Sequence, residues 1–123
     1  MTTEVPPEVQ HKLMRFQEAQ ERLRALTIRR LQYEAELRET EHALEELQKA
    51  PPETPVYKSV GNLLFLTKRD QIVAELTDKK ETLELHIKTL ERQEGLAKKQ
   101  VEELRKDLAK SLSGPSGAPP SIS

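Results

Sequence analysis

The sequence has no cysteine and no tryptophan, and only four of its 123 residues are phenylalanine or tyrosine. Without cysteine, neither a disulfide framework nor a thiolate metal site can form, which fits a protein of a reducing compartment. Hydrophobic residues make up 35% of the chain and charged residues 33%. This composition has too little bulky apolar material for a globular core. It is typical of long solvated helices that pair along a narrow apolar seam.

The chain also lacks an excess of charge of either sign and a long hydrophobic run. Its 20 basic and 21 acidic residues leave a net charge of −1, so no strong field favours nucleic acid or an anionic membrane. No run approaches the roughly 18 apolar residues of a membrane span, and residues 1–7 lack the order of a signal peptide. We therefore expect a cytoplasmic protein with neither nucleic acid nor membrane among its partners.

Motifs that carry chemistry are missing as well. The sequence contains no glycine-rich phosphate loop, no dinucleotide fingerprint, no metal-spaced cluster of His and Cys and no serine nucleophile elbow. Carboxylate pairs such as Glu45-Glu46 and Glu102-Glu103 are interpreted as solvated helix surface, where they can pair with nearby Lys or Arg. The sequence predicts no enzyme, no cofactor and no metal site, and the histidines are expected on solvated faces.

Two long stretches of the sequence carry a heptad pattern, and the first runs from about residue 8 to 49. It contains neither Pro nor Gly, follows Pro6 and Pro7, and ends before the Pro-rich residues 51–55, so it predicts one continuous helix. Nine of its twelve core heptad positions are apolar. These a and d positions are Val9, Lys12, Phe16, Ala19, Leu23, Leu26, Arg30, Tyr33, Leu37, Thr40, Leu44 and Leu47.

The second heptad stretch predicts a helix over about residues 68–112. Thr67 is a good N-cap residue, and Asp70 three positions later completes a variant of the capping box. Two helices of equal length should fold back as an antiparallel coiled coil with both termini at one end. Opposed residues should have numbers that sum to about 117, which sets Tyr33 opposite Leu83 and Leu23 opposite Glu94. The core positions, nine of twelve again apolar, are Val73, Leu76, Lys80, Leu83, Ile87, Leu90, Glu94, Ala97, Val101, Leu104, Leu108 and Ser111.

Between the helices lies a short apolar insert that predicts a β-hairpin over about residues 56–66. Gly61-Asn62 is the kind of Gly-X pair that closes a two-residue loop, and strand-forming residues flank it. An isolated two-stranded ribbon is marginal in water and leaves two edges unpaired, so we expect an assembly element. Alternatively, its apolar residues lie back on the end of the coiled coil. The residues predicted to serve assembly are Val56, Tyr57, Val60, Gly61, Leu63, Leu64, Phe65 and Leu66.

A second candidate surface, which we call the terminal tip, lies where the helices end near the two termini. Terminal turns lose packing on one side and fray, so apolar residues there can contact unfolded chains without reading their sequence. The alternative is that these residues simply close the seam. Residues 1–112 are expected to form one domain, and residues 113–123, rich in Pro, Gly and Ser, are predicted to be disordered. The terminal tip consists of Val9, Leu13, Phe16, Val101, Leu104, Leu108 and Leu112.

Three segments of the sequence resemble the β-class subunits of prefoldin, closely in their archaeal form. They are Val56-Tyr57-Lys58-Ser59-Val60-Gly61-Asn62-Leu63, Glu81-Thr82-Leu83-Glu84 and Arg92-Gln93-Glu94. The resemblance runs from about residue 6 to 112, and the single hairpin indicates the β class, because the α class carries two. Gly95 departs from the family pattern, which has a charged helix former there, and the tail is longer than usual.

The resemblance implies a mainly α fold, a long antiparallel two-helix coiled coil whose one β-hairpin at the helix connection joins an oligomeric β-barrel. The implied assembly is a hexamer of two α-class and four β-class prefoldin subunits, with six coiled coils hanging from a double β-barrel. Unfolded or nascent proteins are then held between the coiled-coil tips without ATP and passed to a group II chaperonin. A structural coiled-coil scaffold that binds no client is the alternative function.

Overall fold

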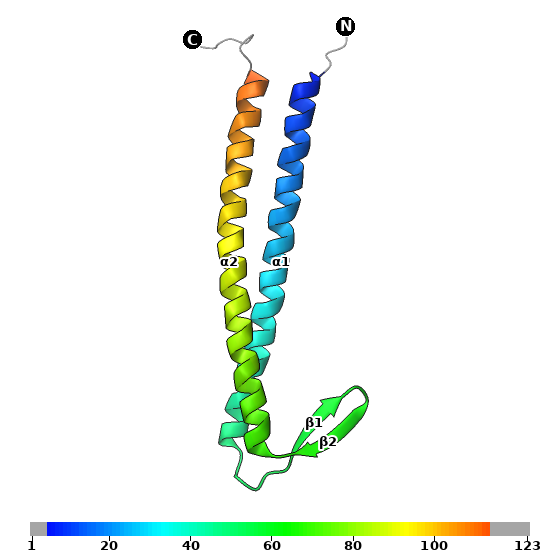
Figure 1. Cartoon of the computed structure of the whole chain (residues 1–123), viewed down its shortest axis with the longest axis vertical. Coiled ribbons are helices and arrows are strands. Elements are labelled where there is room, and N and C mark those ends of the chain that lie inside the picture. The colour runs from blue at the N-terminus through cyan, green and yellow to red at the C-terminus, as the bar shows by residue number, and fades with distance from the viewer. Residues whose placement is uncertain (1–4, 114–123) are drawn as a thin grey trace. The chain divides into compact units, whose positions relative to one another are not determined.

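The computed structural model describes residues 5–113, which form a helix, a β-hairpin and a second helix in that order. The elements are helix α1 (Pro7–Lys49), strands β1 (Val56–Val60) and β2 (Leu63–Thr67), and helix α2 (Arg69–Ser113) (Figure 1). The predicted order of helix, hairpin and helix is therefore confirmed. Of the segment predicted to be disordered, residues 114–123 lie outside the described residues, whereas Ser113 ends α2. None of the helices described is long and apolar enough to cross a membrane.

Proline limits α1 at both ends. Pro7 is the first helical residue, where its missing N–H costs nothing. The Pro6 carbonyl accepts the first hydrogen bond of the helix, from the Gln10 amide at 3.0 Å. The helix ends at Lys49, two residues before Pro51, because a proline ring cannot continue the hydrogen-bond ladder.

The connection after α1 is tied to the start of α2. A turn closes within the Pro-rich segment, where the Thr54 amide donates to the Pro51 carbonyl at 3.0 Å. The Arg69 guanidinium donates to the Ala50 carbonyl at 2.9 Å. This contact places a positive charge at the negative end of the α1 dipole and satisfies a carbonyl that the helix leaves free.

The first residues of α2 differ from the predicted cap. The helix begins at Arg69, and its first hydrogen bond runs from the Ile72 amide to the Lys68 carbonyl at 3.1 Å. Lys68 therefore stands at the N-cap position, and the prediction that Thr67 caps the helix is wrong by one residue. Thr67 is instead the last residue of β2, where it pairs with Val56. Strand pairing keeps its backbone extended, so the helix can start only after it.

The predicted heptad seam is confirmed, because all twelve core positions of each helix are buried or half-buried. Thr40 and Glu94 are polar seam residues that are only 4% exposed. Thr40 donates to the Glu36 carbonyl at 2.9 Å, and Glu94 accepts a hydrogen bond of 2.6 Å from Thr27, one turn beyond Leu23, the residue predicted to oppose it. Within residues 5–113 every buried side-chain nitrogen and oxygen has a hydrogen-bond partner, which allows the seam to hold polar groups.

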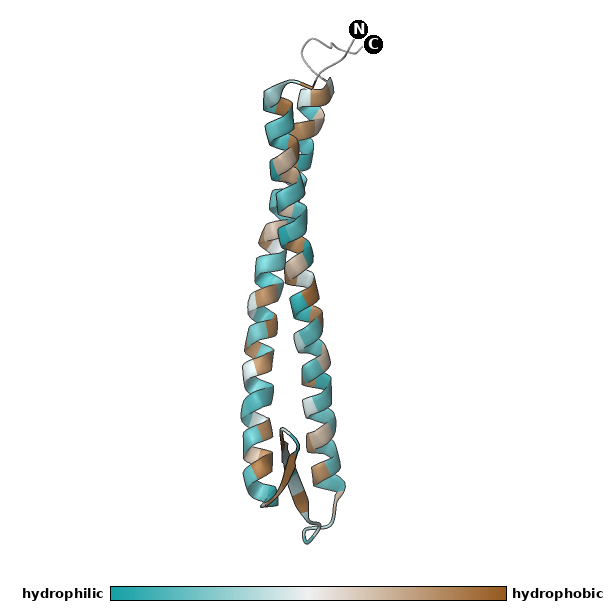
Figure 2. Cartoon of the chain, turned by 90° about the vertical axis from the view of Figure 1, so that its right-hand side faces the viewer, coloured by the Kyte–Doolittle hydropathy of each residue, from teal (hydrophilic) through white to brown (hydrophobic). Residues whose placement is uncertain are grey.

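The described residues form two compact units that share both helices. The first unit contains residues 5–28 and 90–113, and the second contains residues 29–89 with the hairpin. In the first unit the Lys12 ammonium lies 2.6 Å from the Ser111 hydroxyl, so the beginning of α1 lies beside the end of α2 (Figure 1). Figure 2 shows hydrophobic residues recurring along both helices and within the hairpin.

The second unit confirms the antiparallel direction and refines the register. The ion pair between Glu36 and Lys79, 3.4 Å long, joins residues whose numbers sum to 115, close to the predicted 117. The Tyr33 ring stacks on His86, three residues beyond Leu83, with 5.1 Å between centroids and 11° between planes. His86 is exposed, as expected.

The hairpin has the predicted two-residue loop. Val60 pairs with Leu63, and Gly61-Asn62 connects them. Gly61 has a φ of +60°, a left-handed conformation that glycine adopts without the steric cost of a Cβ atom. β2 extends one residue further than expected, to Thr67.

Candidate interaction surfaces

Most apolar side chains of the hairpin are open to solvent. Six of the eight residues predicted to serve assembly have large apolar or aromatic side chains that are exposed, with exposed fractions from 50% for Phe65 to 70% for Leu64. Val56 is half-buried, and Gly61 lies in the exposed turn. The six residues are Tyr57, Val60, Leu63, Leu64, Phe65 and Leu66. Exposed apolar side chains that cluster in one element are typical of interaction surfaces.

The strand register distributes these side chains over both faces of the hairpin. Cross-strand partners share a face, and successive residues alternate between faces. One face carries Tyr57, Ser59, Leu64 and Leu66, and the other carries Val56, Lys58, Val60, Leu63, Phe65 and Thr67. An antiparallel sheet that only covers its own chain commonly has one polar face. This hairpin has exposed leucines on both.

A single charged contact fastens the hairpin to α2. The Lys58 ammonium lies 3.0 Å from the Glu75 carboxylate. On the same face as Lys58, Val56 and Thr67 at the base of the hairpin are half-buried. Contact with the helices therefore covers the base and leaves the six large apolar side chains open. The alternative arrangement, with the apolar residues lying back on the coiled coil, holds only at the base.

The hairpin surface continues at its edges and at its base. The sheet has only β1 and β2 among the described residues, so each strand has one edge without a partner strand. A groove of about 910 Å³ opens at the base, with Pro52, Pro55, Leu66, Arg69 and Val73 among its lining residues. Open edges and a neighbouring groove give an incoming chain both backbone and side-chain partners.

The structure divides the terminal tip by exposure. Val9 and Leu108 are buried, Phe16, Val101 and Leu104 are half-buried, and Leu13 and Leu112 are 41% and 67% exposed. Most of the tip therefore closes the seam, while two residues already face solvent. The prediction of the terminal tip missed Met14, which is 57% exposed and follows Leu13 in the chain. An apolar residue at an outward heptad position was the signal that could have found it.

A polar contact interrupts the seam at the same end. The Lys12 ammonium lies 2.6 Å from the Ser111 hydroxyl, 3.4 Å from an Asp107 carboxylate oxygen and 4.0 Å from Glu8. Its side chain is 23% exposed, since the four-carbon stem lies in the seam while the ammonium reaches polar partners. Lys12 thus joins α1 to α2 within the terminal tip.

Glu102 and Arg105 form an ion pair on the surface of α2. The Arg105 guanidinium donates hydrogen bonds of 3.0 and 2.7 Å to Glu102, and they hold the pKa of Glu102 below its ordinary value. The two side chains are 54% and 50% exposed. A surface ion pair of this kind supports the helix and is no sign of acid–base chemistry.

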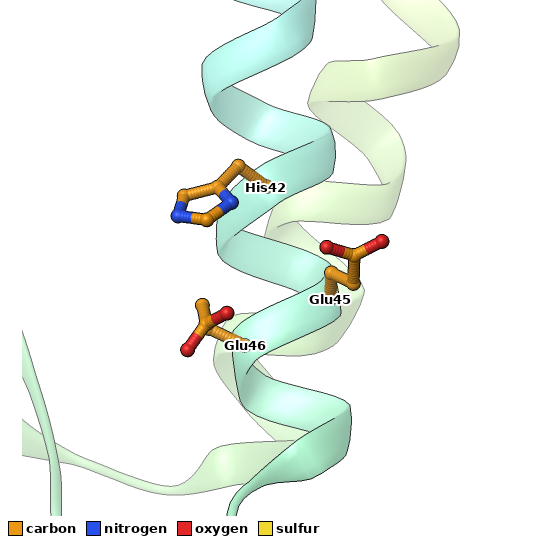
Figure 3. A group of neighbouring side chains, drawn as sticks. All are labelled: His42, Glu45 and Glu46. Carbon is orange, nitrogen blue, oxygen red and sulfur yellow. The ribbon is translucent and has the colours of Figure 1, made fainter.

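Three potential metal ligands lie on consecutive turns of α1 (Figure 3). Ligand atoms of His42, Glu45 and Glu46 lie within 4.8 Å of one another, and all three residues are exposed. Glu45 also lies 4.0 Å from the Lys49 ammonium. A structural zinc site takes four ligands in a closed shell, and this group of three is the largest among residues 5–113. A solvated helix face accounts for it.

Comparisons with known proteins place this architecture in a family. A family model described as "Prefoldin subunit" matches residues 10–114. The prefoldin subunit beta of Pyrobaculum islandicum is 48% identical over 110 residues, which cover 89% of this chain and 88% of that protein. That of Archaeoglobus fulgidus is 48% identical over 114 residues, 93% of this chain and 98% of that protein. The crystal structure of the prefoldin beta subunit from Thermococcus strain KS-1 is similar with a TM-score of 0.79 and 35% identity, and covers 93% of this chain and 100% of that one.

Proposed function

The chain belongs to the prefoldin subunit family, and we propose that it acts as a β-class subunit of an ATP-independent holdase for unfolded or nascent proteins. Members of this family are non-enzymatic chaperone components, so the chain is a prefoldin chaperone subunit and not an enzyme. The proposal adds what the subunit binds, how it assembles and where it delivers its client. We place this activity in the cytoplasm.

The exposed hairpin is the observation that carries the proposal. Its six large apolar side chains are 50–70% exposed on both faces of a ribbon with two open edges. Full burial contributes about 1.5–3 kcal/mol for each such side chain. Strands from other subunits that pair with both edges would close a β-barrel and leave no edge exposed. The assembly we propose joins four β-class and two α-class subunits through their hairpins.

Client binding is proposed for the terminal tip, where α1 begins and α2 ends. Leu13, Met14 and Leu112 present exposed apolar surface, and Phe16 and Val101 are half-buried. Apolar contacts are non-directional, so they suit unfolded chains of any sequence. One tip offers few contacts and binds weakly. Several tips in one assembly raise the effective concentration and hold a client firmly while each contact stays reversible.

Delivery to a group II chaperonin completes the proposed function. A client held by several weak contacts can be transferred stepwise, because each tip can release before the others do. The small number of exposed apolar side chains at each tip supports such exchange. Tight single-site binding would instead slow transfer, since affinity differences appear mainly in the rate of dissociation.

The test compares two leucines with the same exposure. Leu112 at the tip and Leu85 in the second unit are both 67% exposed on α2. The chain, assembled with an α-class prefoldin subunit, is mixed with guanidinium-denatured lysozyme upon dilution, and aggregation is followed by light scattering. We expect Leu112→Ser combined with Leu13→Ser to lower the suppression of aggregation several-fold. Leu85→Ser should leave it unchanged.

A structural scaffold without client binding is the second candidate. The burial of Val9 and Leu108 favours it, because buried seam residues stabilise the coil and offer nothing to a client. If the wild-type assembly forms fully yet does not slow aggregation at all, the scaffold is the better description. Equal effects of the tip and Leu85 variants would also contradict the proposed client site.

A further inference from the structure

At the terminal tip, a lysine of α1 contacts two polar residues of α2. Lys12 lies at a seam position of α1, and its ammonium reaches the Ser111 hydroxyl at 2.6 Å and the Asp107 carboxylate at 3.4 Å. Both partners belong to α2 and to the same compact unit as Lys12. The Lys12 side chain is 23% exposed and Asp107 is 51% exposed, so water and salt can compete for this contact.

The two buried residues of the terminal tip, Val9 and Leu108, lie one turn from Lys12 and Ser111. Val9 precedes Lys12 by three residues, and Leu108 precedes Ser111 by three, so each apolar residue neighbours a polar one on its helix face. Val9 is 9% exposed and Leu108 is 8% exposed. Separating the helix ends enough to present these two side chains would also break the contacts of Lys12.

We propose that Lys12, Asp107 and Ser111 form a latch that limits how much of the terminal tip a client can reach. The tip then has two layers. Leu13 and Leu112 are exposed while the latch is closed, and Val9 and Leu108 become available only when it opens. This inference rests on the proposed client binding and adds its regulation: a weak, partly exposed ion pair keeps the tip mostly closed but lets it open readily.

Charge-reversal variants test whether the Lys12 ion pair, and not apolar packing alone, holds the helix ends together. Lys12→Glu replaces attraction to Asp107 by repulsion while keeping a good helix former at the position. Asp107→Lys in the same chain restores an opposite-charge pair with the signs exchanged. The matched control is Lys99→Glu, which makes the same charge change at an exposed position of α2 in the same unit.

Amide hydrogen exchange of the full chain measures opening directly. We expect Lys12→Glu to speed exchange in residues 8–14 and 106–112 about three- to tenfold, the scale of a lost partly exposed ion pair with added repulsion. The double variant should return most of the way to wild type, and Lys99→Glu should match wild type there. Raising salt should speed exchange in the wild type and slow it in Lys12→Glu. Unchanged exchange in Lys12→Glu, or no recovery in the double variant, would overturn the latch.

Binding of reduced, carboxymethylated lysozyme, which cannot refold, tests the consequence for clients. In chains assembled with an α-class subunit, we expect Lys12→Glu to bind this probe about two- to fivefold more tightly and the double variant to bind like the wild type. Faster exchange without tighter binding would show that the latch does not control the client site and would overturn the proposal. A wild type that binds no probe contradicts the proposed function itself, whereas the exchange data test the latch separately.

Discussion

Leucines of the hairpin are exposed to solvent, whereas leucines of the seam in the same chain are buried. Leu83 and Leu90 in α2 are 4% and 6% exposed, whereas Leu64 and Leu66 in β2 are 70% and 68% exposed. The side chains are chemically identical, so their own hydrophobicity does not explain the difference. Each helix buries its seam against the other helix, whereas both faces of the hairpin keep large apolar side chains exposed.

Clustering of apolar side chains, more than the exposure of any single one, indicates an interface. Leu85 on α2 is 67% exposed, as much as the hairpin leucines, but its neighbours Glu84 and His86 are polar and exposed too. Single exposed apolar residues are ordinary on protein surfaces. In the hairpin, six large apolar side chains follow within ten residues, and burying them together gives far more free energy than any one could.

The largest expected effect comes from placing a charge in the hairpin. In the proposed assembly Leu64→Asp would bury a carboxylate where an apolar side chain lay, without a partner charge. We expect subunit association to weaken at least about a hundredfold. Native mass spectrometry of the chain mixed with an α-class subunit measures it, as a loss of the hexamer.

Leu85→Asp is the matched control, since this residue is nearly as exposed and lies in the same unit. Its hexamer should persist. If Leu64→Asp leaves the native mass unchanged, the hairpin does not mediate assembly, and its contrast with the seam has no functional meaning.

An intermediate effect is expected in the seam itself. Leu83→Ala removes a buried side chain and leaves a cavity, which should lower the free energy of unfolding by about 2–5 kcal/mol. Leu85→Ala, two residues away on an exposed face, should change it by less than about 0.5 kcal/mol. Urea unfolding followed by circular dichroism, at one fixed chain concentration, gives both values. Similar losses in the two variants would show that the seam does not dominate helix stability.

The seam could be predicted from the sequence because it depends on local periodicity. Every core heptad position is buried or half-buried, including the polar Arg30, Lys80 and Glu94. The Gly61-Asn62 loop was equally predictable, since a two-residue hairpin needs a residue that tolerates positive φ. Both patterns are set by residues a few positions apart, and in this chain no other contact overrides them.

Features that depend on competition or on distant contacts were not predictable. Thr67 has a good N-cap side chain, but pairing with Val56 keeps it in the strand. Tyr33 stacks on His86, a contact between residues far apart in the sequence that periodicity alone cannot identify. The terminal tip was predicted as one group. Which of its residues are buried depends on how the ends of α1 and α2 pack, and this packing includes the contacts of Lys12 with α2.

The smallest expected effect contrasts two glycines, one in each region. An added Cβ would meet no atom within 4 Å at either Gly61 or Gly95, so neither substitution creates a clash. The backbone conformation alone therefore decides whether alanine stabilises or destabilises the protein. At Gly61, with φ at +60°, Gly61→Ala should destabilise the turn by roughly 1–2 kcal/mol. At Gly95, within α2, Gly95→Ala should stabilise the helix by about 0.5–1 kcal/mol, because alanine loses less backbone entropy.

The two glycine variants should therefore move the urea midpoint in opposite directions, although the chemical change is the same. A stabilising Gly61→Ala would mean that the turn does not keep its left-handed glycine. A destabilising Gly95→Ala would mean that the helix needs a flexible point there. Opposite signs would instead show that the hairpin depends on a special backbone conformation at one residue, whereas the helix pair depends on regular geometry throughout.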